Sequence, residues 1–347
     1  MKNELKLESI KRELEQLRRV KIDNLINVSN AEWYSLFKDE IRNSIAIEGV
    51  FANRTDLIDV LENNKRTDKH KAASILGYFE SASAMYEYAV NQYKEKEFSL
   101  RMSDIKQIHT LLMRYEKEMG FYIGDLGELR KTRAEVAQST FTPISEFYVR
   151  PAMELFIKWI HYHLSKNIYN PIELAAMSHV WFESIHPFRD GNGRVGRILL
   201  SYILIGCGLI NIAIKGISKK DRNHYYDALE QADNAFEDIH RKMEQGEKFD
   251  VAGVDQLIKL KVFDEIKTII LDRLNDSVGR LKEIDIHNIN KEAELSLSEL
   301  ARIYNYSSDY LRNLINRGKL KGRKKGKTWY VRVRDMAAYA EEAGNGA

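Results

Sequence analysis

Hydrophobic residues recur every three to four positions along most of this chain, which is the spacing of helices that bury one face. Near the start, Leu7, Ile10, Leu14 and Leu17 follow this pattern. All four prolines fall between residues 143 and 187, so the sequence on either side can run as uninterrupted helix. The pattern predicts a mainly α-helical fold. The first apolar stripe is typical of a helix that packs on its own domain, and the alternative is the seam of a homodimer.

Two segments depart from this helical pattern. Glycine, threonine and proline gather before residue 145, and the sequence over about 134–150 suits a short β-hairpin. The second segment, Ile198 to Ile214, carries no charge, but a membrane span needs about 20 apolar residues. Because Gly206 and Gly208 interrupt it, the run predicts a buried helix with a turn near its end. We assign it no membrane role.

Composition narrows the class of protein. The chain has 347 residues, of which 44% are hydrophobic and 30% charged, with a net charge of +3. These values are typical of a folded protein rather than a disordered or membrane one, and the length predicts two or three domains. The single cysteine, Cys207, excludes a disulfide framework and a multi-cysteine zinc site. Because the N-terminus lacks the apolar core of a secretory signal, we expect a cytoplasmic protein.

The most chemically dense part of the sequence runs from His186 to Arg197 and reads His-Pro-Phe-Arg-Asp-Gly-Asn-Gly-Arg-Val-Gly-Arg. The proline and the first glycines break the preceding helix, and the charge-free run that follows begins a new one. The backbone N–H groups of Gly-Asn-Gly then lie at a helix N-terminus, which favours anions. Arg194 and Arg197 are three positions apart and project from one side of that helix. Together these features predict a polyphosphate site.

Two more side chains in this run supply chemistry. Asp190 offers hard oxygen ligands that suit a Mg²⁺ ion held against a polyphosphate. His186 ordinarily titrates near neutral pH and can take a proton from an attacking hydroxyl. The run therefore predicts a site where a hydroxyl attacks a phosphorus atom.

The same run matches the signature of the Fic family, His-x-Phe-x-Asp/Glu-Gly-Asn-Gly-Arg-x-x-Arg, at every fixed position, and the chain resembles that family. The resemblance implies a protein adenylyltransferase that moves AMP from ATP to a tyrosine, serine or threonine hydroxyl of a target protein, and of itself, with release of pyrophosphate. It implies that His186 is the catalytic base, that Phe188 anchors the loop and that Asp190 binds Mg²⁺.

The resemblance also implies which residues bind ATP. They are Gly191, Asn192, Gly193, Arg194, Val195, Gly196, Arg197, Tyr225 and Tyr226. The two tyrosines belong to a segment similar to the family's Tyr-Tyr segment on the adenine side. Because adjacent residues cannot share one helix face, we expect one tyrosine to pack in the core and the other to meet the nucleotide.

Upstream of the signature, Gly127 to Arg130 resembles the family's Gly-x-x-Arg segment, although Leu126 replaces the usual proline. The hairpin expected next resembles the family's flap, which holds the target peptide by strand addition. The target-positioning residues implied are Thr140, Phe141 and Thr142.

An inhibitory helix is a further expectation. Fic proteins often carry Ser/Thr-x-x-x-Glu-Gly/Asn, and residues 44–49 read Ser-Ile-Ala-Ile-Glu-Gly. Ser44 and Glu48 share a helix face, and Gly49 can end the helix in a left-handed conformation. We expect Glu48 to pair with Arg197 and so to occupy the guanidinium that holds the γ-phosphate.

The pattern changes again after residue 290. Ser296 and Glu299 form a capping box, Ser307 or Ser308 begins a second helix, and Gly318 ends it. The next residues, 319–334, alternate apolar and polar positions around two glycines, which predicts a hairpin wing. The module resembles winged helix-turn-helix domains of the excisionase and MerR-like kind.

The C-terminal module is strongly basic. Between Arg312 and Arg334 there are ten lysines and arginines and no acidic residue, and removing them from the net charge of +3 leaves −7 for the rest of the chain. Such a surface suits the DNA backbone, and alternatives are a solvated basic face and a protein-docking module. The candidate DNA-binding residues are Arg312, Arg317, Lys319, Arg323, Lys324, Lys325 and Lys327.

We therefore expect a Fic-type helical bundle with a short β-hairpin flap, joined to a small winged helix-turn-helix domain. The expected parts are an N-terminal helical region (1–95), a catalytic core (96–245), a helical connector (246–290) and the C-terminal domain (291–347). ATP is the expected substrate, Mg²⁺ the cofactor, and a target protein the partner, with double-stranded DNA and a second copy of the chain as further candidates. Alternative functions are AMP removal, other nucleotidyl transfer, and DNA-binding regulation with a core that only senses nucleotide.

Overall fold

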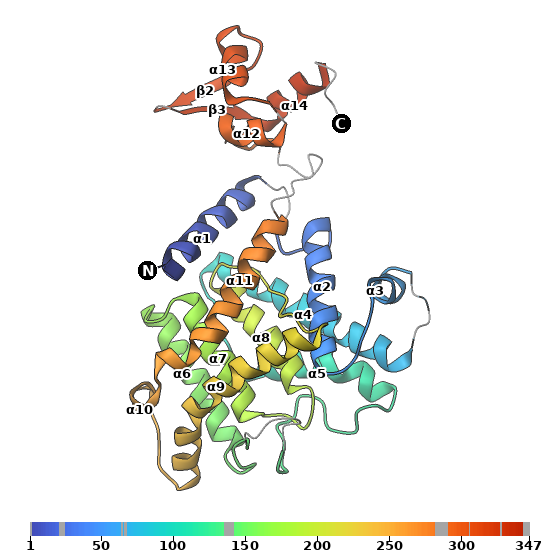
Figure 1. Cartoon of the computed structure of the whole chain (residues 1–347), viewed down its shortest axis with the longest axis vertical. Coiled ribbons are helices and arrows are strands. Elements are labelled where there is room, and N and C mark those ends of the chain that lie inside the picture. The colour runs from blue at the N-terminus through green and yellow to red at the C-terminus, as the bar shows by residue number, and fades with distance from the viewer. Residues whose placement is uncertain are drawn as a thin grey trace. The chain divides into compact units, whose positions relative to one another are not determined.

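The computed structural model describes residues 2–20, 25–63, 65, 68–134, 142–281, 291–304, 306–326 and 328–342. The chain divides into two compact units, one formed by Ser35–Ser277 and the other by Met1–Tyr34 together with Val278–Ala347. Helices dominate the described residues, which confirms the predicted fold class (Figure 1).

The larger unit is entirely helical within its described residues, and two of its helices, α2 and α11, continue past its limits. Its elements are α2 (Ala31–Ile47), α3 (Arg54–Leu61), α4 (Lys69–Glu95), α5 (Met102–Glu118), α6 (Val149–Lys166), α7 (Pro171–Ile185), α8 (Asn192–Gly206), α9 (Lys219–Glu244), α10 (Val251–Leu257), the 3₁₀ helix η1 (Leu260–Phe263) and α11 (Asp264–Leu281).

Helices α7 and α8 form the centre of this unit. They pack against each other, α4 packs on α8, and α6 packs on α7. The charge-free run from Ile198 is buried along its whole helical part, and the chain turns at Gly208 with φ of 82°. This confirms the predicted buried helix with a turn. No helix among the described residues is both long and apolar enough to cross a membrane.

Helix α7 has strong sequence signals at both ends. The Asn170 side chain accepts hydrogen bonds from the N–H groups of residues 172 and 173, Pro171 occupies the first turn, and Glu173 completes a capping box. At the other end His186 adopts a left-handed conformation, with φ of 51°. Because a non-glycine residue rarely takes this conformation, the end of α7 fixes the direction in which the signature loop leaves the helix.

The segment expected to be a connector contributes to the core of the larger unit. Helices α10 and η1 pack on α9, and α10 also packs on α6. Phe263 is fully buried and its ring lies 5.9 Å from that of Phe236. The N-terminal helices α2, α3 and α4 belong to this same unit. The expected domain limits at residues 95 and 245 stay proposals, since no change of packing marks them.

The first helix, α1 (Lys2–Val20), carries the predicted apolar stripe. Its four apolar side chains are no more than 4% exposed in the single chain. The stripe is therefore buried within the protein itself.

The C-terminal module folds as a small mixed structure. It contains β1 (Glu294–Ser296), α12 (Leu297–Ile303), α13 (Ser308–Asn316), β2 (Gly322–Lys325), β3 (Thr328–Arg332) and α14 (Val333–Glu342). The strands form an antiparallel sheet in the order β1-β3-β2.

The predicted helix-turn-helix and wing are both present in this module. Ser296 caps α12, Ser307 caps α13, and Gly318 follows α13 in a left-handed conformation. Two features differ from the prediction. Strand β1 adds a third strand, and Val333 begins α14 instead of extending the wing, although its side chain still joins the module's core.

A glycine at the α4–α5 contact yields a stability prediction. A Cβ atom on Gly77 would overlap the backbone carbonyl of Leu112, whereas a Cβ on Gly279 in α11 would meet no described atom. We expect Gly77→Ala to lower the free energy of unfolding by about 1–3 kcal/mol through overpacking. Gly279→Ala should raise it by about 0.5–1 kcal/mol through helix propensity. Denaturant titration of both variants measures this difference, and equal effects would contradict it.

Candidate active site

The signature loop is held in place by side chains beneath it. Asn192 accepts a hydrogen bond from the N–H of Phe188 (2.8 Å) and donates one to its carbonyl (2.9 Å). The Phe188 ring is fully buried and stacks on His109 with centroids 4.0 Å apart. The predicted anchor is therefore present, and the side chain of Asn192 closes the loop, so only its backbone N–H is left to face a ligand.

Helix α8 begins at the glycines of the loop. Gly191 has φ of 77°, and a side chain there would collide with Met113. A Cβ on Gly193 would collide with the carboxylate of Glu48. The N-terminus of α8 thus already faces an acidic group, as expected for an anion-binding helix end.

His186 is suited to act as a base. Burial, aided by the charge of Arg130, lowers its pKa to about 4, despite the opposing influence of Glu48 and Asp190. Its ring is therefore neutral at pH 7. Its Nδ1 atom is buried without a hydrogen-bond partner in the described structure, so the ring retains capacity to exchange a proton with a ligand.

Arg194 and Arg197 have different partners. Arg194 forms a buried ion pair with Glu116 of α5, with Nη2 lying 3.2 Å from Oε2. Glu116 also accepts a hydrogen bond from Ser74 of α4 (2.8 Å). Arg194 is therefore pre-oriented by α4 and α5 rather than free to move.

Arg197 contacts the helix that carries the expected inhibitory motif. Its Nη2 lies 2.5 Å from Oε1 of Glu48 and donates to the backbone carbonyl of Ser44 (3.0 Å). Its Nε donates to the Ser44 hydroxyl (2.8 Å). The ion pair that the sequence predicts between Glu48 and Arg197 is present, and both fixed polar residues of the motif contact the same guanidinium.

The electrostatics favour Glu48 as the anionic partner of Arg197. Burial alone would raise the pKa of Glu48, but the charge and hydrogen bond of Arg197, together with the charges of Arg194 and His186, keep it below its usual value. A second acid nearby, Glu183, behaves in the opposite way, because burial raises its pKa to about 8. Glu183 is therefore mostly neutral at pH 7, and Glu48 supplies the negative charge.

Helix α2 is anchored by contacts outside the motif. Buried Glu40 accepts hydrogen bonds from Tyr78 (3.0 Å), from Tyr86 and from Asn211 (2.6 Å). One turn further, the Asn43 side chain accepts from the N–H of Gly216 (2.9 Å). Sequence reasoning missed this network, since it joins residues that are far apart in the chain.

The two adjacent tyrosines of α9 occupy different environments. Tyr225 is 2% exposed and its hydroxyl lies 2.7 Å from Nε2 of His179. Tyr226 is 40% exposed and donates a hydrogen bond to the carbonyl of Ile47 (3.0 Å), next to Glu48. Tyr225 is thus the tyrosine in the core, and Tyr226 is the one on the accessible side.

Arg130 ties the loop to the base of the expected flap. Its guanidinium donates to the carbonyls of His186 (2.7 Å), Thr132 (3.0 Å) and Ile144. The backbone N–H of Arg130 also donates to the carbonyl of Pro187 (2.9 Å). The Gly-x-x-Arg pattern identified Arg130 as a site residue. The pattern alone did not show that its side chain links Thr132 and Ile144, the residues on either side of 133–143, to the signature loop.

The flap itself lies largely outside the described residues. Residues 135–141 are not described, so Thr140 and Phe141 have no assigned position. Thr142 is exposed, and the part of the expected hairpin that is described, residues 142–150, contains no strand.

Asp190 is compatible with a Mg²⁺ ion that takes its other ligands from the substrate phosphates. The residue is exposed, and one carboxylate oxygen accepts the N–H of Gly191 (2.6 Å). Among the described residues no group of three His, Cys, Asp or Glu side chains could hold a metal. Mg²⁺ commonly binds through one or two carboxylates plus substrate phosphates, so a single aspartate is compatible with it.

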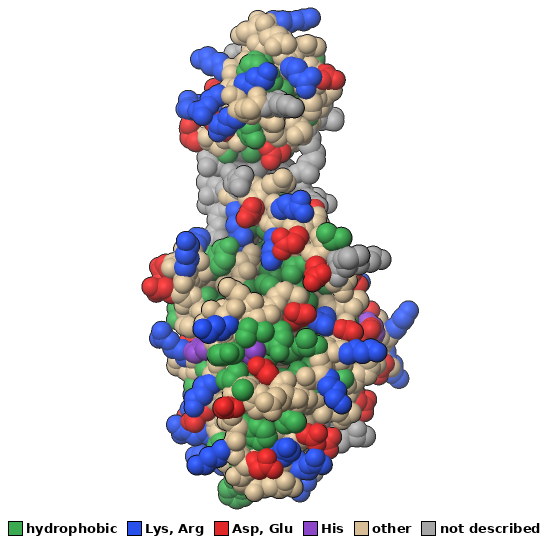
Figure 2. Space-filling model, turned by 90° about the vertical axis from the view of Figure 1, so that its left-hand side faces the viewer, with side chains coloured by type: hydrophobic (Ala, Val, Ile, Leu, Met, Phe, Trp, Pro, Cys, Tyr) green, Lys and Arg blue, Asp and Glu red, His purple; other side chains and the backbone are tan. Residues whose placement is uncertain are grey.

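The basic residues of the C-terminal module divide into paired and unpaired groups. Arg312 pairs with Asp309 (2.9 Å), and Lys325 pairs with Glu294 (2.7 Å). In the part of the chain that the structure describes, four other candidates form no ion pair, namely Arg317, Lys319, Arg323 and Lys324. Lys327 lies outside the described residues. Figure 2 shows lysine and arginine side chains gathered on the visible face of this module.

Comparisons with known families agree with this fold and site. The profile of the Fic/DOC family matches residues 99–204, and that of a helix-turn-helix domain matches residues 294–344. Both matches fall on the elements described above.

Two related sequences illustrate the relationship. A probable protein adenylyltransferase of Aquifex aeolicus is 29% identical over 307 residues, which is 87% of this chain and 86% of that protein. The protein adenylyltransferase Fic of Nematostella vectensis is 34% identical over 142 residues, covering 40% of this chain but only 30% of that protein.

Two solved structures share the fold. A Fic domain containing signalling protein from Bacteroides thetaiotaomicron has a TM-score of 0.61 at 20% identity, over 81% of this chain and 98% of that one. Fic-1 from Caenorhabditis elegans has a TM-score of 0.56 at 18% identity, over 81% and 72% of the two chains.

The helical core and the anion-binding loop at the start of α8 define the architecture of a Fic domain, here joined to a helix-turn-helix domain. Residues 99–204 therefore form a domain of the Fic/DOC family, and residues 294–344 form a helix-turn-helix domain.

The anchor of α2 gives a pH prediction. Burial outweighs three hydrogen-bond donors and raises the pKa of Glu40 from 4.5 to about 7. Between these values the folded protein holds a proton that the unfolded chain releases, so this contribution to stability falls as the pH rises. Relative to Glu40→Gln, the wild type should lose roughly 3 kcal/mol of unfolding free energy across this window. Denaturant titrations at several pH values measure this, and parallel curves for the two proteins would contradict it.

Proposed function

We propose that this chain is a protein adenylyltransferase that transfers AMP from ATP to a hydroxyl side chain of a target protein. The observation that carries the proposal is the arrangement around the start of α8, where a neutral His186, backbone N–H groups and two buried arginines converge. Relatives named protein adenylyltransferase support it.

In the proposed reaction, His186 takes the proton of the target hydroxyl, whose oxygen attacks the α-phosphorus of ATP. The bond from that phosphorus to the bridging oxygen breaks, and pyrophosphate leaves. Arg194, held by Glu116, and Arg197 would stabilise negative charge on the phosphates, and the N–H groups of Gly191 to Gly193 would add fixed dipoles. Mg²⁺ held by Asp190 would neutralise charge on the phosphate oxygens.

Glu48 would act as a brake on this reaction. Its carboxylate pairs with Arg197 and abuts Gly193, so it takes both the guanidinium and part of the anion cradle. A phosphate group cannot use Arg197 fully while Glu48 keeps this position. The restraint is local, because the carboxylate is carried by the turn residue between the end of α2 at Ile47 and Gly49.

AMP removal is a second candidate for the same site. The observation that favours it is that the Glu48 carboxylate lies close enough to the His186 ring to raise the pKa of that ring. A carboxylate is thus near the proposed catalytic base. In this direction Glu48 would orient a water molecule for attack on the AMP–protein bond. The two directions predict opposite roles for Glu48, so one variant separates them.

The first test of function is Glu48→Gly in the full-length chain. Freed from its competitor, Arg197 should engage the phosphates, and labelling of the protein itself or of lysate proteins by radioactive ATP should rise at least about tenfold. Adding His186→Ala should reduce that labelling by about a hundredfold or more.

Glu97→Gly removes an exposed carboxylate outside the site and is the matched control. Equal labelling by wild type and Glu48→Gly would refute the brake. Faster AMP release from a labelled target by the wild type than by Glu48→Gly would assign removal as the main activity. Mass spectrometry of the labelled protein distinguishes AMP from another nucleotide.

We further expect the C-terminal domain to bind double-stranded DNA through Arg323 and Lys324, which stand on β2 and form no ion pair with any described residue. Lys324→Glu and Arg323→Glu should weaken binding to a random-sequence duplex, and each should reduce the salt slope of the affinity by about 1. Lys94→Glu, on α4 of the larger unit, is the control. Fluorescence anisotropy at several salt concentrations measures the slopes. Unchanged affinity in both variants would leave a protein-docking role for the domain.

A further inference from the structure

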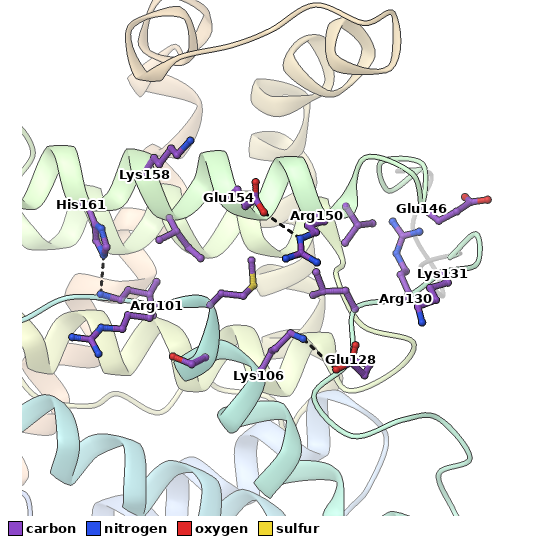
Figure 3. Close-up of a pocket in the computed structure, with 16 residues that line it drawn as sticks. Arg101, Lys106, Glu128, Arg130, Lys131, Glu146, Arg150, Glu154, Lys158 and His161 are labelled. Atoms are coloured by element: carbon purple, nitrogen blue, oxygen red, sulfur yellow. Dashed lines mark hydrogen bonds and ion pairs between the residues drawn. The ribbon is translucent and has the colours of Figure 1, made fainter.

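A large groove lies in the larger unit, outside the candidate active site. It has a volume of about 750 Å³ and runs between the start of α5, residues 128–131 and the first turns of α6 (Figure 3). Its size is that of a binding cavity for a ligand of several residues or a drug-sized molecule. None of the roles assigned above to the signature loop, the inhibitory helix or the tyrosines uses this groove.

The groove combines an apolar floor with a positive rim. Leu100 and Val149 are buried in its floor, and Leu129 and Ile157 also line it. The rim includes six lysine or arginine residues and three glutamates, so its net charge is positive. A ligand that fits this surface needs both apolar and acidic groups.

The existing ion pairs leave part of this positive charge uncompensated. Lys106 pairs with Glu128, and Arg150 pairs with Glu154, each at 3.2 Å. Three other cations, Arg101, Lys131 and Lys158, form no ion pair within the described residues. They come from three different segments of the chain.

The unpaired cations are distributed along the groove. Figure 3 shows Lys131 at one end with Arg130 and Glu146, and Arg101 and Lys158 at the other end with His161. A compact anion such as a phosphate would need donors that converge on one point. Charges at both ends of an apolar floor instead fit an extended ligand, such as a peptide segment.

The groove also adjoins the active site. Arg130 forms part of its wall, and the same guanidinium donates to the carbonyls of His186, Thr132 and Ile144. One end of the groove therefore reaches the base of the segment that we expect to present the target hydroxyl. A target segment that is bound at this base can therefore extend directly into the groove.

From this geometry we propose that the groove docks a segment of the target protein in which acidic side chains flank apolar ones. This inference rests on the proposed transfer to a protein target. Acidic side chains of the segment contact Arg101 and Lys158 at one end and Lys131 at the other, while apolar side chains cover Leu129 and Ile157. The groove thereby selects targets by sequence around the modified hydroxyl.

A binding experiment tests the groove without relying on AMP transfer. The probe is a short fluorescein-labelled peptide that alternates glutamate and leucine, and the matched peptide alternates glutamine and leucine. Anisotropy with the full-length protein should show tighter binding of the acidic peptide. The double variant Arg101→Glu, Lys158→Glu should bind it about tenfold more weakly, which corresponds to about 1.4 kcal/mol.

Lys166→Glu is the matched control, since Lys166 is an exposed lysine on the same helix that does not line the groove. It should bind the acidic peptide as the wild type does. The milder pair Arg101→Gln, Lys158→Gln keeps the test valid if charge reversal disturbs folding. Equal binding of the two peptides, or an unchanged affinity in the double variant, would overturn the proposal. Competition by tripolyphosphate at equal concentration would overturn it too, in favour of a small-anion site.

A second arm uses the Glu48→Gly background and lysate labelling. Adding Arg101→Glu and Lys158→Glu should lower protein labelling about tenfold, while binding of a fluorescent ATP analogue stays unchanged. If Glu48→Gly alone labels no protein, the proposed function fails, but the peptide experiment still decides whether the groove binds acidic segments. Normal labelling combined with absent peptide binding refutes the groove and leaves the proposed function standing.

Discussion

The positive charge of Arg197 is the constraint on which the site depends. Its side chain is 4% exposed, and a buried charge without a partner costs several kcal/mol. In this structure Glu48 and Ser44 satisfy it, so the guanidinium holds the end of α2 against the start of α8. A phosphate group could replace Glu48 without leaving the charge uncompensated. The proposed brake would then be a competition between two anions for one cation.

The outcome of such a competition depends on how firmly α2 is docked elsewhere. Glu40 with its two tyrosines and Asn211, Asn43 with Gly216, and Tyr226 with Ile47 all hold α2 in the position from which Glu48 reaches Arg197. Weakening any of them lowers the effective concentration of Glu48 at the guanidinium, which shifts the populations without altering the catalytic groups. The strength of the proposed brake would thus be distributed over the surface of one helix.

The parts of this arrangement that sequence could predict are those encoded by neighbours along the chain. The helix break at Pro187, the α8 start at the glycines, the shared face of Ser44 and Glu48, and the capping serines of the C-terminal domain are all local. The partners of Arg194 and of Glu40 are not, because Glu116 and Asn211 stand 78 and 171 positions away. A single sequence does not indicate which buried acid pairs with which buried hydrogen-bond donor, because the pairing depends on how α4, α5 and α8 pack.

The charge distribution of the C-terminal domain likewise depends on contacts that the sequence does not show. In sequence, the ten basic residues from Arg312 to Arg334 form a positive block without an acidic residue, but folding brings acids from before that block against it. Glu292 pairs with Arg334 and Glu294 with Lys325, while Asp309 pairs with Arg312 one turn away on α13. These pairs are exposed and each adds little stability, yet they weaken the local potential where they lie. Among the described residues, the cations without an ion pair include Arg323 and Lys324 on β2 and Arg317 and Lys319 just after α13. The wing and the end of the second helix should therefore attract a phosphate backbone most strongly.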